Sequence, residues 1–254
     1  MGTQAAQATP TTQATTHERS ATTHGTSPSV RVIDYVSVVK AAYAAYQAYA
    51  SRNELSLEEA TQRILNSIDS AKTQILSHID QVATAEARAC ARQSVIDFAD
   101  ITRFTTDTLQ AFARDTTGCV TRIDSLLATV SDKAAVDQLG FAANAVGPIS
   151  LVARARAGFQ TAGLKGTLVN AHNAITAGLE PRCVTVRVRE PGLRRTIIEE
   201  QITCTAYNGH TGWDSRIISP GPPGPRIDVD ALKLEAASGT SWVAAKAVLP
   251  VLQS

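Results

Sequence analysis

Three residues just after a predicted tight turn are the best candidates for a small binding site. Asn208-Gly209 is typical of a type I′ hairpin turn, and it is followed by His210, Trp213 and Asp214. An aromatic face and polar groups would meet there, on a loop of the kind that commonly carries binding residues. The simpler interpretation is that Trp213 packs into the core of a sheet and the loop only closes the hairpin. We favour the simpler interpretation.

Motifs that would indicate catalysis are missing from the sequence. It contains no GxSxG nucleophile motif, no HExxH, no phosphate-binding GxxxxGK[ST] and no GxGxxG dinucleotide fingerprint. His78 and His172 have no partner at the spacing of metal ligands. We therefore predict that the protein is not an enzyme and that it has no catalytic residues, no cofactor and no metal.

The four cysteines form no CxxC pair, which argues against a metal or redox motif. We expect Cys90 and Cys119 to be free thiols, buried as small hydrophobic side chains. Cys183 and Cys204 could face each other across a hairpin. Residues 1–29 lack the basic start and the apolar run of a secretory signal, which predicts a cytoplasmic, reducing location. Export by a route without a cleaved signal is the alternative.

The segment from Gln138 to Ala153 carries no charge. It is shorter than the roughly 20 apolar residues that span a bilayer, and Gly147-Pro148 is expected to break it. We favour a buried helix–turn–helix with Pro148 at the start of its second helix. The alternative is a hairpin that is stored in the folded protein and inserts into a membrane. The candidate residues for such a membrane or partner hairpin are Phe141, Val146, Ile149 and Leu151.

Neither glycine nor proline occurs between Ser29 and Thr117, and these two residues interrupt helices most strongly. A first helix is expected from Arg31 to Ala50. Further along the chain, apolar periodicity predicts shorter helices over 107–115, 119–139, 149–159 and 167–179. We expect Gly118 to end the first of these, and Gly163 and Gly166 to lie in the turn before the last.

A second, much longer helix is predicted to start at Ser56. Ser56 and Glu59 have the spacing of a capping box. Apolar residues then recur at intervals of seven, which is typical of a coiled coil: Ile68, Ile75, Val82, Ala89 and Ile96. If this helix is unbroken to Arg103, it is about 70 Å long.

After Pro181 the apolar period changes to two, the period of a strand. We expect an antiparallel meander with strands at 182–189, 196–207 and 210–219. A two-residue turn at Asn208-Gly209 would set Cys204 opposite Trp213. Such a small sheet needs a cover on one face, and the expected cover is the last helix, which carries Trp242, Val243, Val248 and Leu249.

Arginine outnumbers lysine by 18 to 6, and four arginines crowd the first hairpin of this meander: Arg187, Arg189, Arg194 and Arg195. Such a hairpin could meet phosphate or carboxylate groups. A solvated strand face explains the pattern equally well, with arginine paired across the strands to Glu199 or Glu200.

The composition excludes several classes of protein. The chain has 254 residues, a net charge of +1 and 44% hydrophobic residues. This length can bury a sizeable core, and the apolar fraction is too high for a wholly disordered chain. A dedicated nucleic-acid binder usually has a clear basic excess, so we expect no nucleic-acid partner.

The predicted fold class is mainly α: an elongated antiparallel helical bundle with one very long helix, plus a small C-terminal antiparallel β meander. The predicted organisation is a disordered Thr/Ala/Gln-rich tail (1–29), a helical domain (30–180) and a β-containing module (181–254). A long helix, the uncharged hairpin 138–153 and a β cap give a plan that resembles that of the helical pore-forming toxins.

From these features we predict a non-enzymatic interaction or structural protein that self-associates or binds a protein partner. The long amphipathic helix is the feature that would pair with another copy or with a partner. The resemblance implies the alternative, a membrane-active protein that inserts residues 138–153.

Overall fold

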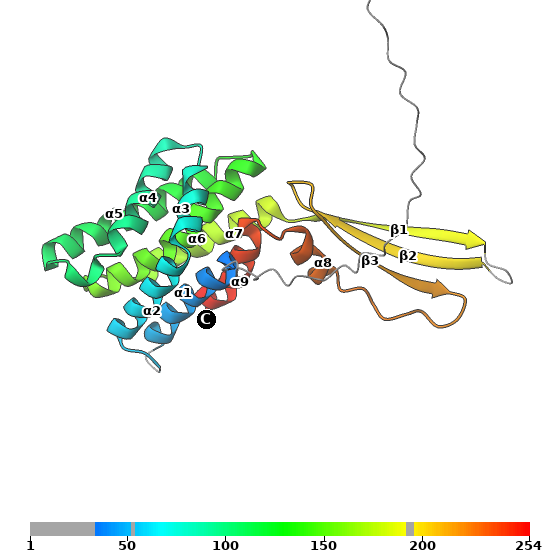
Figure 1. The fold of residues 1–254 in the computed structure, drawn as a ribbon, viewed down its shortest axis with the longest axis horizontal. Helices are drawn as coiled ribbons and strands as arrows, with labels where there is room; N and C mark the ends of the chain where they lie inside the picture. Colours follow the sequence, from blue (N-terminus) through cyan, green and yellow to red (C-terminus); the bar gives the residue numbers. More distant parts are fainter. Residues whose placement is uncertain (1–33, 52–53, 192–195) are drawn as a thin grey trace, which may run out of the picture. The chain divides into compact units, whose positions relative to one another are not determined.

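The computed structural model describes residues 34–51, 54–191 and 196–254, and the predicted tail 1–29 lies outside them. Within these residues the protein is mainly helical, with nine α-helices, one short 3-10 helix (Ile101–Arg103) and a three-stranded antiparallel sheet (Figure 1). The prediction of a mainly α fold with a small antiparallel meander is confirmed.

Helix α6 (Lys133–Arg156) lies at the centre of the helical body, by which we mean helices α1 to α7 and α9. Every residue of α6 from Leu139 to Ala153 is buried. This part of α6 belongs to the uncharged segment 138–153, and a helical segment without charges can be covered on all sides because it has no charged face to keep in water. The helices that contact it are α1 (Tyr35–Ala50), α2 (Leu57–Ser70), α3 (Lys72–Asp80), α4 (Ala85–Phe98), α5 (Thr106–Leu127), α7 (Ala162–Leu179) and α9 (Ser241–Gln253).

The predicted turn at Gly147-Pro148 is wrong, because α6 continues through both residues. A proline inside a helix costs about 3 kcal/mol, but here the surrounding helices bury the whole segment. Gly147 allows close approach of α1, because a Cβ atom there would clash with the Tyr43 hydroxyl group. Gly147 and Pro148 therefore take part in the packing of α6 against its neighbours, and they do not end the helix.

The predicted single helix from 56 to 103 is also wrong, although its start is confirmed. Ser56 and Glu59 form the capping box, with the Glu59 backbone N–H donating to Ser56 Oγ at 3.2 Å. The segment then divides into α2, α3 and α4, with an irregular residue at Ala71 and a turn over 81–84. After this turn the residues at intervals of seven no longer face the core. Ala89 and Ile96 are therefore exposed. The heptad therefore does not continue into α4.

Three glycines that were expected to lie at helix boundaries lie inside helices. Helix α5 passes through Gly118, and α7 contains Gly163 and Gly166. All three positions are exposed, so each costs only the intrinsic penalty of about 1 kcal/mol. The predicted helix over 119–139 is interrupted instead after Leu127, and α6 begins where the Asp132 carboxylate accepts the backbone N–H of Ala135 at 2.8 Å.

All four cysteines form disulfides, Cys90 with Cys119 and Cys183 with Cys204. The first bond joins α4 to α5. The expectation that Cys90 and Cys119 are free thiols is therefore wrong. Both were correctly expected to lie toward the helical core, and there the packing of α4 on α5 brings them together.

The predicted strands are confirmed as β1 (Arg182–Pro191), β2 (Thr196–Thr205) and β3 (Thr211–Ser219), in the order β1-β2-β3 (Figure 1). Helix α8 (Val229–Ala236) packs against this sheet. The expected cover, α9, packs instead against α1, α6 and α7. The Trp242 indole N–H donates to the backbone oxygen of Thr176 at 3.0 Å, which holds α9 on α7.

The register between β2 and β3 differs by one residue from the prediction. Trp213 pairs with Thr203, and Cys204 pairs with Gly212. The Ala206 backbone N–H donates to His210 O at 2.9 Å, so three residues separate this pair at the turn, one more than expected. A shift of one residue moves every side chain of a strand to the opposite face. Trp213 therefore lies on the face away from Cys204.

Candidate functional site

The predicted loop residues do not form one site. His210 lies at the turn, where its backbone N–H donates to Asn208 Oδ1 at 3.2 Å. Trp213 and Asp214 are neighbours on β3, so their side chains leave opposite faces of the sheet. The prediction that Trp213 packs into the core of the sheet is wrong, because 64% of its surface is exposed.

Trp213 belongs to an exposed apolar surface that we call the apolar sheet face. The strand register places its members on one side of the sheet: Val184, Val186, Trp213 and Ile217. Their exposed fractions are 61%, 52%, 64% and 53%, and these four make up most of the large, exposed hydrophobic side chains among the described residues. Single exposed hydrophobic residues are ordinary, whereas several on one face are a candidate for an interaction surface. The polar residues Thr203, Gln201 and Glu199 of β2 lie between the β1 and β3 members of this group.

The opposite face of the sheet is covered in part. Near the turn end, α8 covers Cys204 and Gly212. Further along, buried Glu200 forms ion pairs with Arg216 at 2.6 Å and Arg187 at 3.5 Å. The hydrogen bond from Arg216 holds the pKa of Glu200 below its ordinary value, with a smaller contribution from Arg187. The sequence predicted that Arg187 or Arg189 could lie across from Glu199 or Glu200, and the pair in the structure is Arg187 with Glu200.

The two edges of the sheet are formed by β1 and β3. The proline-rich connector after β3 returns beside that strand, and the Gly224 backbone N–H donates to Ile217 O at 3.0 Å. Prolines cannot donate a ladder hydrogen bond, which suits a segment that ends a sheet. The connector follows the β3 edge, and the arginine-bearing strand β1 forms the other edge.

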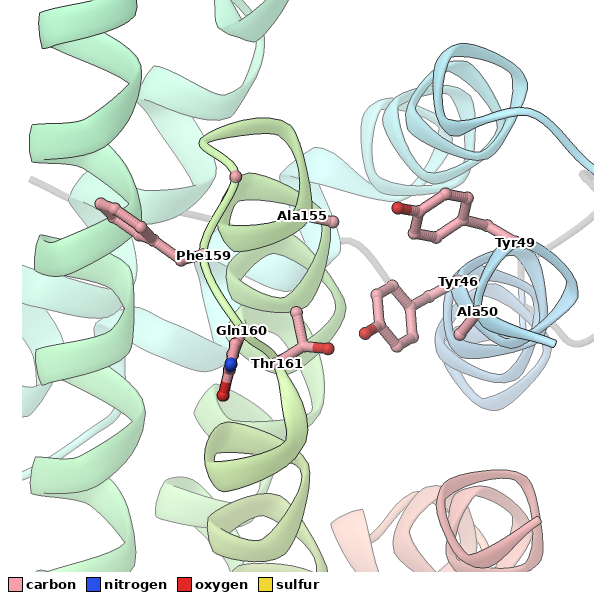
Figure 2. A pocket seen from close by; sticks show the side chains of 8 residues that line it. Tyr46, Tyr49, Ala50, Ala155, Phe159, Gln160 and Thr161 are labelled. Carbon is pink, nitrogen blue, oxygen red and sulfur yellow. The ribbon is translucent and has the colours of Figure 1, made fainter. Parts of the chain in front are cut away.

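A pocket of about 400 Å³ lies between the end of α1 and the α6–α7 connection (Figure 2). Tyr46 and Tyr49 line one side, and Ala155 with residues 158–161 line the other. The Tyr46 hydroxyl points toward Thr161, and burial raises the pKa of Tyr46. The lining offers hydroxyl, amide and aromatic groups to a small neutral ligand. It includes no carboxylate, amine, imidazole or thiol among the described side chains.

A cluster of polar groups is buried where α6 meets α9 and the hairpin turn. The Asp137 carboxylate accepts hydrogen bonds from the Tyr207 hydroxyl at 2.7 Å, the Ser241 backbone N–H at 2.7 Å and the Ser241 hydroxyl at 2.8 Å. A buried charge is tolerated when it is fully hydrogen-bonded. The Ser241 hydroxyl thus donates its hydrogen bond to Asp137. The cluster joins α6, α9 and the hairpin turn.

His172 is the second buried polar group in this region. Its Nδ1 lies 2.7 Å from the backbone oxygen of Leu168, and its Nε2 lies 3.0 Å from the side-chain amide of Asn144. Burial lowers the pKa of His172 to about 4, although the hydrogen bond to Leu168 opposes this shift. His172 is therefore neutral at pH 7 and acts as a packing residue between α7 and α6.

The four candidate residues of the uncharged segment are all buried in α6: Phe141, Val146, Ile149 and Leu151. Phe141 stacks on the His78 ring, with the ring centroids 3.9 Å apart. None of the helices in the described parts of the chain is both long enough and apolar enough to cross a membrane. Within the same residues, no group of three or more His, Cys, Asp or Glu side chains could hold a metal ion.

Sequence reasoning recognised the alternating valines of β1 but missed the apolar sheet face. The signal was present, since Val184, Val186 and Val188 alternate with polar residues. The error came from the assumed register, which set Trp213 on the covered side, and from the expectation that α9 covers the sheet.

No family model, no curated protein and no solved structure matches this chain.

Proposed function

We propose that this chain is a non-enzymatic interaction protein whose binding surface is the apolar sheet face. The observation that carries the proposal is the exposure of Val184, Val186, Trp213 and Ile217 on one side of a sheet whose other side is covered in part by α8. More than half of each of these side chains is open to water. Covering them with a partner would remove that apolar area from water, which is favourable.

The non-enzymatic part of the proposal is supported by the polar groups of the helical core. Asp137 and Ser241 bond to each other, and His172 bonds to Leu168 and Asn144. Catalytic groups need an open position for a substrate. Here each group is buried, and its hydrogen bonds are made to other groups of the helical core.

A photo-crosslinking amino acid placed on the sheet tests the proposed binding surface. We expect the full-length protein carrying it at Val186 or Ile217 to form adducts in the cells that produce it. The matched controls are Ile96 on α4 and Leu234 on α8, which are exposed aliphatic residues away from this face. Equal adduct yields at all four positions, or no adducts at Val186 and Ile217, would overturn the proposal. Mass spectrometry of the adducts distinguishes a protein, a lipid and a second copy.

The runner-up proposal is a membrane-active protein that inserts the segment 138–153. It is supported by one observation: this uncharged segment is enclosed by the other helices, as expected for an apolar helix that is stored until release. Its 16 residues would extend about 24 Å as a helix, which is short of the roughly 30 Å of a bilayer core.

Dye release from vesicles separates the two proposals. Insertion predicts leakage that a charged substitution at Val146 or Ile149 abolishes in a protein that remains folded. If α6 is only a core helix, wild-type protein causes no leakage, and the same substitution unfolds the protein because it buries an unpaired charge.

The location of the protein remains a proposal. Disulfide bonds persist in oxidising surroundings and are rare in the cytosol. The two disulfides therefore support an oxidising location over the reducing, cytoplasmic location that the sequence predicted.

A further inference from the structure

We propose that the outer edge of β1 pairs with the same edge of a second copy of this chain, so that two antiparallel strands join two sheets into one. The inference goes beyond the proposed function, because it concerns the edge of the sheet and not the apolar sheet face. Among the described residues, β2 is the only strand that pairs with β1. A strand edge with unpaired backbone groups is a template for another chain.

The direction of the β1 backbone groups follows from the strand register. The Ala206 backbone N–H donates to His210 O, so the even-numbered residues of β2 bond to β3 and its odd-numbered residues bond to β1. Since Cys183 lies opposite Cys204, the β1 partners of those odd-numbered residues are even-numbered. The Cα atoms of the two cysteines are 3.9 Å apart, which agrees, because hydrogen-bonded pairs lie about 5.5 Å apart. The N–H and C=O groups that point outward are those of Cys183, Thr185, Arg187 and Arg189.

Two prolines mark the ends of this outward-facing segment. Pro191 and, just before the strand, Pro181 occupy the next outward positions, where a missing N–H breaks no bond to β2. No proline lies between them, so the N–H groups in the middle of the edge can donate. At the other edge, by contrast, the proline-rich connector follows β3. Within the described residues, β1 is therefore the edge that can accept a further strand.

The sequence of β1 favours a second copy as the occupant, because its charges and valines are symmetric about Val186. When two copies of a strand pair antiparallel about a central residue, positions equally far from that residue lie opposite each other. About Val186, Arg182 lies opposite the partner's Glu190, and Val184 lies opposite the partner's Val188. The dimer repeats both pairs, and opposite charges directly across two strands stabilise their pairing.

Arg182 and Glu190 are both available for this contact. Both side chains are exposed, and neither forms an ion pair with any described residue. Glu199 pairs with Val188, so it is a diagonal neighbour of Glu190 on the same face. The partner's Arg182 would therefore also offset the repulsion between these two carboxylates.

Neighbouring registers fit the chain less well. Pairing centred on Arg187 sets the two copies of that residue directly opposite each other, and pairing centred on Val188 sets Arg187 opposite Arg189. Like charges in direct opposition are destabilising. Pairing centred on Thr185 sets Arg182 opposite Val188, which leaves its charge without a counterpart. The charges thus select the register centred on residue 186.

The opposite face of the strand is compatible with this register. Arg187 then lies opposite the partner's Thr185, and Arg189 lies opposite the partner's Cys183. These are the residues whose backbone groups point outward, so the pairing forms about eight backbone hydrogen bonds. The two copies of Arg187 are diagonal neighbours, and each forms an ion pair with Glu200 of its own chain at 3.5 Å.

Sedimentation velocity of the full-length protein over a series of concentrations tests for the dimer. Pairing of one strand buries little area, so we expect a monomer–dimer equilibrium in the micromolar range. Thr185→Pro removes an outward N–H and no bond to β2, and it should weaken dimerisation at least tenfold. The matched control, Thr185→Ala, keeps this N–H and should dimerise as the wild type does.

A charge exchange tests the register. Arg182→Glu alone and Glu190→Arg alone each place like charges opposite each other, so each variant should dimerise at least tenfold more weakly than the wild type. A mixture of the two variants places opposite charges at both ends of the paired strands and should restore association.

A cysteine at the centre of the edge provides an independent check. Val186→Cys sets the two new Cα atoms about 4.5 Å apart, within reach of a disulfide between the copies. Val184→Cys and Val188→Cys each lie about 14 Å from their own counterparts, so neither should cross-link alone. A mixture of these two variants should cross-link.

Two results would overturn the inference: wild-type protein that stays monomeric well above the micromolar range, or self-association that Thr185→Pro leaves unchanged. Thermal unfolding shows whether each variant is folded, and the charge exchange is the test if Thr185→Pro is not. Self-association that Ile217→Asp abolishes and Thr185→Pro retains would place the second copy on the apolar sheet face, so the proposed function would stand without this inference. An edge dimer with photo-crosslinks only between copies at Val186, and none at Ile217, would leave this inference standing without the proposed function.

Discussion

His172 shows how burial decides the role of a single residue. The sequence offered no motif around it, and the structure encloses it completely between α7 and α6. Its ring bonds to Leu168 and Asn144, and burial lowers its pKa to about 4 from an ordinary value near 6.5. The folded protein therefore resists protonation of this residue, whereas the unfolded chain does not.

This difference predicts how stability depends on pH. Above about pH 6.5 His172 is neutral in both states and has no effect. As the pH falls from about 6.5 to about 4, the unfolded state binds a proton that the folded state does not. The free energy of unfolding should therefore decrease by about 1.4 kcal/mol per pH unit, or about 3 kcal/mol in all. Urea unfolding at several pH values measures this slope.

Two variants identify the residue responsible for the slope. His172→Gln should remove most of the pH dependence between pH 4.5 and 6.5, even if the variant is less stable overall. His78 is half-buried, and burial also lowers its pKa, so His78→Gln should remove a smaller part. A wild-type stability that is constant over this range would contradict the prediction.

At the scale of the elements, α6 combines apolar side chains with glycines that allow the neighbouring helices to pack closely. A Cβ atom at Gly147 would clash with the Tyr43 hydroxyl oxygen and would lie 2.9 Å from Leu168 Cδ2. A Cβ atom at Gly140 would clash with Ser241 Oγ, the hydroxyl that donates to Asp137. The two glycines thus set the distance of α6 from α1 and α9.

A matched pair of glycine substitutions tests this role. Gly147→Ala should destabilise the protein by about 1–3 kcal/mol, because the added methyl group overpacks a buried contact. Gly118→Ala should stabilise it by about 0.5–1 kcal/mol, because Gly118 lies inside α5 and a Cβ there meets nothing within 4 Å. The free energy of unfolding in urea measures both effects. Equal effects of the two substitutions would refute the assigned packing of Gly147.

The sequence predicted the elements well where the signal was local. The capping box of Ser56 and Glu59, the first helix and the strands were all found, because hydrogen-bonding side chains and apolar periods act over a few residues. The break at Ala71 and the continuation through Pro148 were not found, because packing against distant helices decides them. The face of Trp213 was missed because one residue in the turn sets the register.

At the scale of the whole molecule, two disulfides tie neighbouring elements together. Cys90 and Cys119 link α4 to α5 across 29 residues, and Cys183 and Cys204 link β1 to β2 across 21. A cross-link that closes a loop of about 30 residues stabilises a fold by about 3.5 kcal/mol, mainly by restricting the unfolded chain. The helical body and the sheet each contain one such link.

Thiol titration checks this pairing. Protein isolated without reductant and then denatured should show no reactive thiols, and reduction should release all four. Replacing Cys90 and Cys119 together with serine should lower the free energy of unfolding by up to about 3.5 kcal/mol. Four thiols in the denatured, unreduced protein would contradict the pairing and support the free thiols that the sequence predicted.

By itself the sequence determined that the protein is mainly helical with a small C-terminal antiparallel sheet, and it located the uncharged segment and the arginine-rich hairpin. These properties follow from local backbone preference and from the spacing of apolar residues. Only the tertiary structure decided that the uncharged segment is the buried centre of the helical body and that the exposed apolar surface belongs to the sheet. Burial depends on which elements meet, and strand register and helix packing join residues that lie far apart in the chain.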